Sequence, residues 1–272
     1  MNARVLTVAG IVAFLLIVLV PFWWIASMSF KTYEQIQFAT SIYVPKPFVW
    51  DNYTLLWTAT RFPLWLRNSV VTAVLVTLLT TVVASLAGYA IARLRFPGRE
   101  SFASLILVLY LVPPALLFIP LYRVLAELGA TNSLAALVLS YPTFTVPFCT
   151  WLLIGFFKAL PRELEEAAFV DGAGHWTVFT RIVLPLVRPS LATFGVLSFI
   201  ASWNSFLWPL VIISSQKLMT LPVGIANLQG EHLTAWNLVM AGTTISVIPI
   251  VVVYLFAQKH IVRGFVLSGV KG

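Results

Sequence analysis

The segment PRELEEAAFVDGAGHWTVFTRIVLP (residues 161–185) is a polar, regularly punctuated stretch between two long apolar runs. Its first proline suits the opening turn of a helix, and three glutamates follow in that turn, where the helix dipole favours negative charge. Gly172 can adopt the left-handed conformation that ends such a helix without strain. A second short helix is expected over His175–Val183, with Pro185 closing it. The segment therefore predicts a compact helix–turn–helix elbow.

The composition of the chain is that of a membrane protein. Hydrophobic residues make up 60% and charged residues 10% of the 272 residues, whereas a soluble domain is about half apolar and about a quarter charged. The formal net charge is +8, but the basic residues flank the apolar runs and form no cluster or face, which argues against nucleic acid as a partner. Cys149 is the single cysteine, so it cannot form an intrachain disulfide and is expected to fill a packing position.

Apolar runs recur along the whole chain, and about 20 such residues are needed to cross a bilayer. We expect six transmembrane helices in one domain over residues 1–272. The first run could instead be a secretory signal peptide, but the apolar core of a signal peptide is only about 7–15 residues long, so an anchored helix is expected there. The predicted spans are residues 5–30, 69–91, 102–121, 134–157, 190–213 and 238–257.

The basic residues indicate how these spans are oriented. An even number of spans places both termini on one side of the membrane. Of the 17 Lys and Arg residues, 11 fall in the segments on the side of the N-terminus and the other 6 fall on the opposite side. Because cytoplasmic segments carry more Lys and Arg, both termini, the loop 158–188 and the tail 258–272 are expected in the cytoplasm, with the chain in a bacterial or archaeal plasma membrane.

Prolines interrupt three of the predicted spans. Each proline removes a backbone donor and bends its helix, and the freed carbonyls are tolerated in a membrane where packing or a water-lined cavity satisfies them. Bent helices that line a cavity are one interpretation, and the ordinary frequency of proline in membrane helices is the other. These residues are Pro113, Pro114, Pro120, Pro142, Pro147 and Pro249.

The spans lack the groups that a self-powered transporter or an enzyme needs. Their interiors contain almost no ionisable residues, which ion-coupled carriers use as relays, and no pair of carboxylates or of nucleophile and base for an intramembrane enzyme. No G-x-x-x-x-G-K-[ST] loop is present to bind nucleotide phosphates. We therefore expect no catalytic residue, metal site or cofactor, and energy for uphill transport must come from another polypeptide.

The elbow offers a surface on which such a partner could dock. Small or apolar residues share one side of each predicted helix: Leu164, Ala167 and Ala168 on the first, and Trp176, Phe179 and Ile182 on the second. The alternative is an amphipathic hairpin that lies on lipid headgroups. The acidic first turn argues against lipid, because the inner leaflet is itself negative. The pattern therefore favours a protein partner.

The spacing in this segment matches the EAA signature, E-A-A-x3-G-x9-I-x-L-P, at every fixed position. The chain resembles the maltose-type permease subunits of carbohydrate ABC importers, specifically the smaller of the two permeases, over nearly its full length. LAGYAIARLRFPG (86–98) is similar to a cytoplasmic turn of that family, and VRGFVLSGVKG (262–272) to its C-terminal tail. WNSFLWP (203–209) is similar to its fifth span, although the family often has an acidic residue in place of Ser205. The resemblance implies an all-α type I ABC importer permease fold, with six transmembrane helices and a cytoplasmic EAA coupling helix–turn–helix.

The resemblance also implies partners and a function. The transporter would contain a second permease, usually a different chain, two copies of an ABC ATPase and an external solute-binding protein. The chain would form half of the pathway for a sugar or oligosaccharide and would have no catalytic activity of its own. The same machinery could instead import a polyol, an amino sugar or a glycerophosphodiester. An ATP-independent secondary carrier would have no use for the elbow.

The resemblance assigns roles to four groups of residues. Glu166 would face a basic residue of the ATPase, and Gly172 would set the angle of the elbow. The outer loop Ser214–Asn237 would reach into the binding protein, and the tail would insert between the ATPase subunits. Trp203 lies about 20 Å along the fifth span from its start at Ser190, where it could line the pathway or pack against the partner permease. The coupling group is Glu165, Glu166, Ala167, Ala168, Asp171, Gly172, Ile182, Leu184 and Pro185; the pathway group is Trp203, Asn204 and Phe206; the loop group is Leu221, Pro222, Gly224, Asn227, Gln229 and Gly230; and the tail group is Arg263, Gly264, Phe265 and Lys271.

Overall fold

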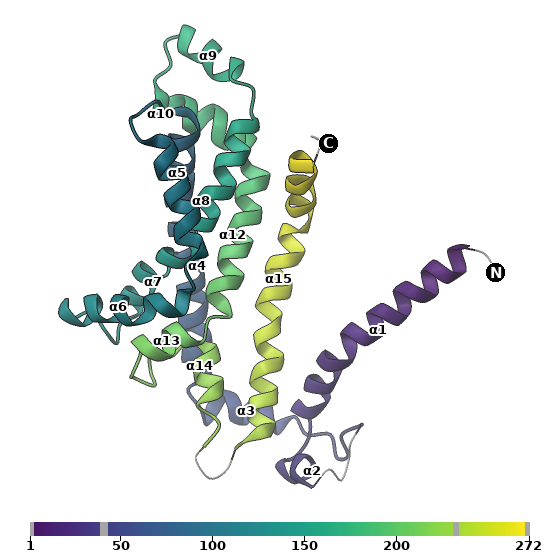
Figure 1. The fold of residues 1–272 in the computed structure, drawn as a ribbon. Helices are drawn as coiled ribbons and strands as arrows, with labels where there is room; N and C mark the ends of the chain where they lie inside the picture. The colour runs from purple at the N-terminus through teal and green to yellow at the C-terminus, as the bar shows by residue number, and fades with distance from the viewer. Residues whose placement is uncertain (1–2, 39–42, 231–233, 270–272) are drawn as a thin grey trace. The chain divides into compact units, whose positions relative to one another are not determined.

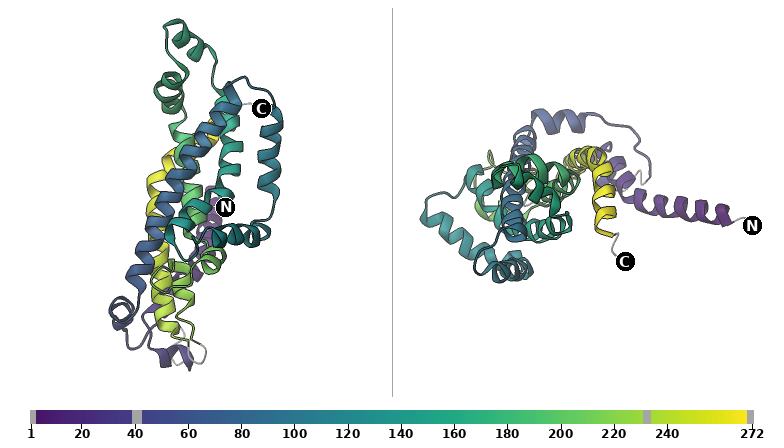
Figure 2. Two further views of the ribbon diagram at one scale, coloured as in Figure 1. Left: turned by 90° about the vertical axis from the view of Figure 1, so that its left-hand side faces the viewer. Right: turned by 90° about the horizontal axis from the view of Figure 1, so that it is seen from above.

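Helices connected by short loops form the computed structural model (Figures 1 and 2), which describes the backbone of residues 3–38, 43–230 and 234–269 and the side chains between Arg4 and Lys259. Within these residues, extended segments pair at one isolated bridge, Gln229–Thr234. The elements are α1 (Ala3–Ser29), α2 (Tyr33–Gln37), α3 (Asp51–Thr58), α4 (Phe62–Arg93), α5 (Arg99–Leu111), α6 (Pro114–Glu127), α7 (Leu134–Ser140), α8 (Pro142–Ala159), α9 (Glu163–Val170), α10 (His175–Val178), a π-helical turn (Phe179–Val183), α11 (Leu184–Leu186), α12 (Arg188–Trp203), α13 (Leu207–Ile212), α14 (Leu221–Ala226) and α15 (Trp236–Gly269).

Length and composition allow up to six of these segments to cross a membrane. Four continuous stretches qualify among the described residues, in α1, α4, α7–α8 and α15. Two bent helix pairs bring the total to six if each pair is one span. The predicted all-helical membrane fold class is therefore confirmed. The boundaries of the membrane spans, and the single domain over residues 1–272, stay predictions.

The third predicted span, residues 102–121, is not one straight helix. α5 ends at Leu111, α6 begins at Pro114, and the two helices meet at an angle of 100°. Pro113 and Pro114 explain the break, because a proline lacks the backbone donor of a continuous helix and disfavours helical geometry in the residue before it. Pro114 is instead in the first turn of α6, where a missing donor is tolerated.

The fifth predicted span, residues 190–213, is also divided. α12 ends at Trp203, and the next helix, α13, starts at Leu207. Upstream, the second elbow helix continues past its expected end at Val183 as far as Leu186, so Pro185 does not close it. The wider π-helical turn directly before Pro185 relieves the clash that a proline ring makes with the carbonyl four residues earlier.

Contacts divide the chain into two units, Met1–Arg67 with Met219–Val251 and Asn68–Leu218 with Val252–Gly272. In the second unit α8 packs against both α5 and α12, and a hydrogen bond of 2.7 Å joins the hydroxyl groups of Thr80 on α4 and Thr145 on α8. Its core lies at the elbow end of these helices and includes Cys149, which is buried as predicted.

Asn52 on α3 organises the first unit. Its amide nitrogen donates to the carbonyl groups of Ser29 and Lys31, each at 2.8 Å. Its amide oxygen accepts from the side chain of Asn237 in α15, also at 2.8 Å. One buried side chain thus joins the segment after α1 to the beginnings of α3 and α15.

Gly224 in α14 lies so close to the indole ring of Trp65 that a Cβ atom at 224 would overlap that ring. We expect Gly224→Ala to lower the free energy of unfolding by about 1–3 kcal/mol, because it overpacks a buried contact. Thermal unfolding in detergent would measure this. Gly155→Ala is the matched control, since Gly155 is also helical but has open space around its Cα; it should be neutral or slightly stabilising. Equal unfolding temperatures for the two variants would contradict the close contact.

Candidate functional site

The elbow predicted from residues 161–185 is present in the second unit. Figure 1 shows α9 and α10 projecting beyond the ends of α8 and α12, to which they are connected. α9 and α10 pack against each other and α9 also contacts the π-helical turn. The elbow is thus a distinct projection from a packed bundle.

Gly172 ends α9 in the manner expected of it. Its φ angle is +84°, and its amide donates to the carbonyl of Phe169 at 3.0 Å, while the amide of Ala173 donates to that of Ala168 at 2.9 Å. These two bonds form the Schellman arrangement that satisfies the last carbonyl groups of a helix. The left-handed turn at Gly172 is therefore confirmed, and its part in coupling stays a prediction.

A buried ion pair fixes the base of the elbow. Arg93, at the end of α4, places its Nε 2.6 Å from Oε1 of Glu165 on α9, and both side chains are less than a tenth exposed. The Tyr89 hydroxyl donates to the other carboxylate oxygen at 3.4 Å. Arg93 also donates to the carbonyl of Leu160 at 2.8 Å, just before the elbow. Glu165, predicted to contact the ATPase, thus has its partner within the chain.

The sequence did not reveal this network. Arg93 and Tyr89 lie in the LAGYAIARLRFPG stretch, and an arginine one turn after a tyrosine at the end of an apolar run was the available signal. That signal did not identify Glu165 among the three glutamates of the first turn of α9, because the two segments are far apart in sequence. Burial distinguishes them, since Glu163 and Glu166 are exposed.

Apolar residues of the second elbow helix anchor it in the core. Phe179 is buried with its ring centroid 4.8 Å from that of Tyr89. Trp176 and Ile182 were expected on the same side as Phe179, but Trp176 is 67% exposed and Ile182 is half-buried, because the π-helical turn changes the register. Leu184 and Pro185 of the predicted coupling group are half-buried in the stem that leads to α12.

The exposed surface of the elbow combines apolar and acidic residues. Val170 is 87% exposed, and it shares the free surface of α9 with Glu166 and the small residue Ala167. Ala168 is half-buried, and Asp171 is exposed beside the turn. The remaining large apolar side chains exposed on the elbow are Leu164, Phe169 and Trp176. Such a surface suits a protein contact.

The break between α12 and α13 gathers the predicted pathway residues. Trp203 is 2% exposed and stacks on Phe199, with ring centroids 5.7 Å apart, which favours the packing interpretation for it. Asn204 is exposed and Phe206 is at the limit of exposure. A role in the pathway stays a prediction for these two residues.

Asn132 supports the end of this broken segment. Its backbone amide donates to the carbonyl of Ile212 at 2.9 Å. Its side-chain oxygen accepts from the amides of Ser214 and Ser215 at 3.2 and 2.9 Å. Protein groups thus satisfy irregular backbone here, as a membrane requires.

The predicted loop group separates by burial. Leu221 and Gly224 are buried and Pro222 is half-buried, so these residues support the loop from within. Asn227, Gln229 and Gly230 are exposed, and contact with a binding protein stays a prediction for them.

The tail differs from the extended segment that its glycines suggested. Arg263, Gly264 and Phe265 lie within the helix α15, which continues to Gly269, because the segment has no proline and a helix tolerates a glycine at a cost of about 1 kcal/mol. Lys271 lies outside the described residues. No group of three or more potential metal ligands occurs among the described His, Cys, Asp and Glu residues.

We expect Glu165→Gln to lower the free energy of unfolding by about 3–5 kcal/mol, because it leaves the charge of Arg93 buried without its partner. Chemical unfolding in detergent, followed by tryptophan fluorescence, would measure the loss. Glu163→Gln removes the same charge from an exposed position in the same turn and should change stability by less than about 0.5 kcal/mol. Equal stability of the two variants would show that the ion pair does not hold the elbow.

Comparison with known proteins places this geometry in a family. A model described as "Binding-protein-dependent transport system inner membrane component" matches residues 81–266, which include the whole elbow. The chain is 37% identical to the trehalose/maltose transport system permease protein MalG of Thermococcus litoralis, over 99% of this chain and 97% of that protein. It is 34% identical to the arabinooligosaccharides transport system permease protein AraQ of Halalkalibacterium halodurans, over 86% of this chain and 83% of that protein.

The fold is also similar to that of a solved transporter. A chain of a bacterial ABC transporter involved in the import of the acidic polysaccharide alginate matches with a TM-score of 0.80 and 22% identity, over 95% of this chain and 98% of that chain. The family match and the extent of identity show that the chain belongs to the binding-protein-dependent transport system inner membrane components, as a permease subunit of an ABC importer and not an enzyme.

Proposed function

We propose that the chain imports a carbohydrate, driven by ATP hydrolysis on a partner protein that docks on the elbow. The observation that carries this proposal is the elbow itself. Its base is held by the buried pair of Arg93 and Glu165, its turn is set by Gly172, and its exposed surface presents Glu166 and Val170. A rigid projection with a free apolar and acidic surface can transmit the movement of a partner to α8 and α12.

Carbohydrate is the favoured solute because the relatives are named for trehalose and maltose and for arabinooligosaccharides. The exposed amide of Asn204, at the break between α12 and α13, could bond to a sugar hydroxyl group. Aromatic Phe206 lies beside it and could pack against a sugar ring. A pathway lined in this way would need only weak contacts, because the solute must leave as well as enter.

The proposed assembly contains a second permease, a homodimeric ABC ATPase and an extracytoplasmic solute-binding protein. Dependence on a binding protein is part of the family description. The bias of Lys and Arg supports cytoplasmic termini and a cytoplasmic elbow, on the side where ATP is available. The ATPase would then shift the permeases between two states by binding one of them more tightly.

Uptake by the reconstituted assembly tests this function. We expect ATP-dependent uptake of a labelled disaccharide or oligosaccharide from a panel that includes trehalose, maltose and arabinooligosaccharides, and no ATP hydrolysis by the purified chain alone. Polyols, amino sugars and glycerophosphodiesters form the control panel. Preferred uptake of a control solute would overturn the carbohydrate assignment, and uptake without ATP would overturn the coupled mechanism.

Gly172→Val should abolish most of the transport while the chain still enters the membrane. A β-branched residue is strained in the left-handed conformation that Gly172 adopts, so the elbow would point in a wrong direction. Gly172→Asn is the matched control, because asparagine tolerates this conformation and no atom would contact a Cβ at this position. Uptake should fall at least tenfold in the valine variant and stay near normal in the asparagine variant. Similar uptake by both would show that the turn does not set coupling.

A further inference from the structure

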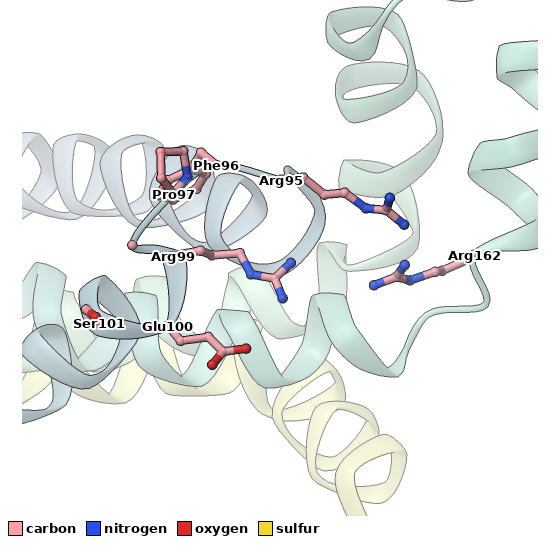
Figure 3. A pocket seen from close by; sticks show the side chains of 8 residues that line it. Arg95, Phe96, Pro97, Arg99, Glu100, Ser101 and Arg162 are labelled. Atoms are coloured by element: carbon pink, nitrogen blue, oxygen red, sulfur yellow. The ribbon is translucent and has the colours of Figure 1, made fainter.

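The turn between α4 and α5 and the residue before α9 border an open pocket of about 750 Å³ (Figure 3). Arg95 lies in the turn, Arg99 is the first residue of α5, and Arg162 directly precedes α9. Figure 3 shows the guanidinium groups of these three residues extending toward the same space. None of the three belongs to the predicted coupling group.

The pocket carries excess positive charge. Across the residues that the structure describes, no ion pair involves Arg95, Arg99 or Arg162, and Arg99 makes one long hydrogen bond, at 3.5 Å, to the carbonyl of Leu94. Glu100 is the one acidic residue of the lining, so three positive groups face one negative group. Like charges that converge repel each other, and a bound anion would remove this repulsion.

The surroundings of the pocket favour an anion that carries apolar chains. The pocket opens at the start of α5, none of whose residues is buried. Phe102 in the first turn of α5 is exposed, and its ring centroid is 6.1 Å from that of Phe96 in the pocket lining. Exposed apolar residues continue along the helix at Leu105, Val108, Leu109 and Leu111. A phospholipid with its phosphate in the pocket could lay its acyl chains along this surface.

We propose that Arg95, Arg99 and Arg162 bind the phosphate of an anionic phospholipid in the leaflet at the elbow side of the membrane. Guanidinium groups form paired hydrogen bonds with phosphate oxygens, and basic pockets at the cytoplasmic ends of membrane helices bind anionic headgroups. The site rests on the proposed membrane orientation but not on the identity of the transported solute.

The location of Arg162 gives this site a consequence for the elbow. Arg162 is the N-cap residue of α9, and its carbonyl accepts from the amides of Glu165 and Glu166 at 2.9 and 3.0 Å. A phosphate shared by Arg162 and Arg95 would therefore connect the first turn of α9 to the turn after α4. The lipid would reinforce from outside the connection that Arg93 and Glu165 make from within.

Native mass spectrometry of the delipidated full chain in detergent tests the site. The probes are dioctanoyl phosphatidylglycerol, dioctanoyl phosphatidylcholine and inorganic phosphate. The pocket variant is Arg95→Gln with Arg162→Gln, and the matched control is Arg181→Gln with Arg188→Gln, which removes two exposed arginines from the same predicted side. Arg95→Lys with Arg162→Lys keeps the charge but loses the paired hydrogen bonds, and circular dichroism checks the fold of each variant.

We expect phosphatidylglycerol to bind the wild type and the control equally and to bind the pocket variant about 30-fold more weakly, the effect of two arginines at an anionic membrane surface. The lysine variant should lie between them, and phosphatidylcholine should bind weakly to all. Equal binding of phosphatidylglycerol to the pocket variant and the wild type would overturn the proposal. Inorganic phosphate that binds as tightly as the lipid would indicate a site for free phosphate.

A protein partner is the remaining occupant that the test must exclude. The co-expressed ATPase subunit is purified with each variant, and its recovery is compared with lipid binding. Loss of the ATPase from the pocket variant, with lipid binding unchanged, would assign the arginines to an acidic protein surface and overturn the lipid site. Loss of lipid binding with the ATPase retained would support it, whatever the outcome of the uptake experiments.

Discussion

The buried contact between Arg93 and Glu165 is the interaction on which the functional end of this permease depends. A buried charge is strongly unfavourable without its partner, so α9 cannot separate from the end of α4 without stranding two charges. Arg93 also holds the carbonyl of Leu160, which fixes the chain on the entry side of the elbow. Movement applied to the exposed surface of α9 must therefore pass to the helices as a whole.

The interrupted helices follow a second constraint, which is that backbone groups in a membrane need protein partners. After the break between α12 and α13, Asn132 supplies both an amide donor and a side-chain acceptor to the segment that follows α13. The indole of Trp208 on α13 donates to the hydroxyl of Ser140 at 2.9 Å. These bonds allow an irregular segment to exist within a predicted span, which is where a permease needs polar groups.

Local chemistry made much of this fold predictable. Apolar run length predicted the helical membrane fold, and Asp171-Gly172 predicted the end of α9, because left-handed glycine is a local requirement. The 100° bend between α5 and α6 was not predicted, although its prolines were identified, because proline alone does not say whether a helix bends or ends. The pairing of Glu165 with Arg93 and the contact of Gly224 with Trp65 depend on tertiary packing, which spacing does not encode. The roles of the exposed loop and tail residues depend on partners outside the chain.

The π-helical turn at Phe179–Val183 also fixes a rotational phase. Each residue of an α-helix advances the chain by about 100° around the axis, and a π-helical turn contains one residue more than an α-helical turn spans. Deleting a single residue there would let the stem become regular α-helix, but it would rotate everything that follows by roughly a quarter turn relative to Phe179. Asn204 and the other polar groups of α12 would then face a different side of the bundle while the elbow stayed in place. The length of this short stem therefore determines which face of α12 responds when the elbow moves.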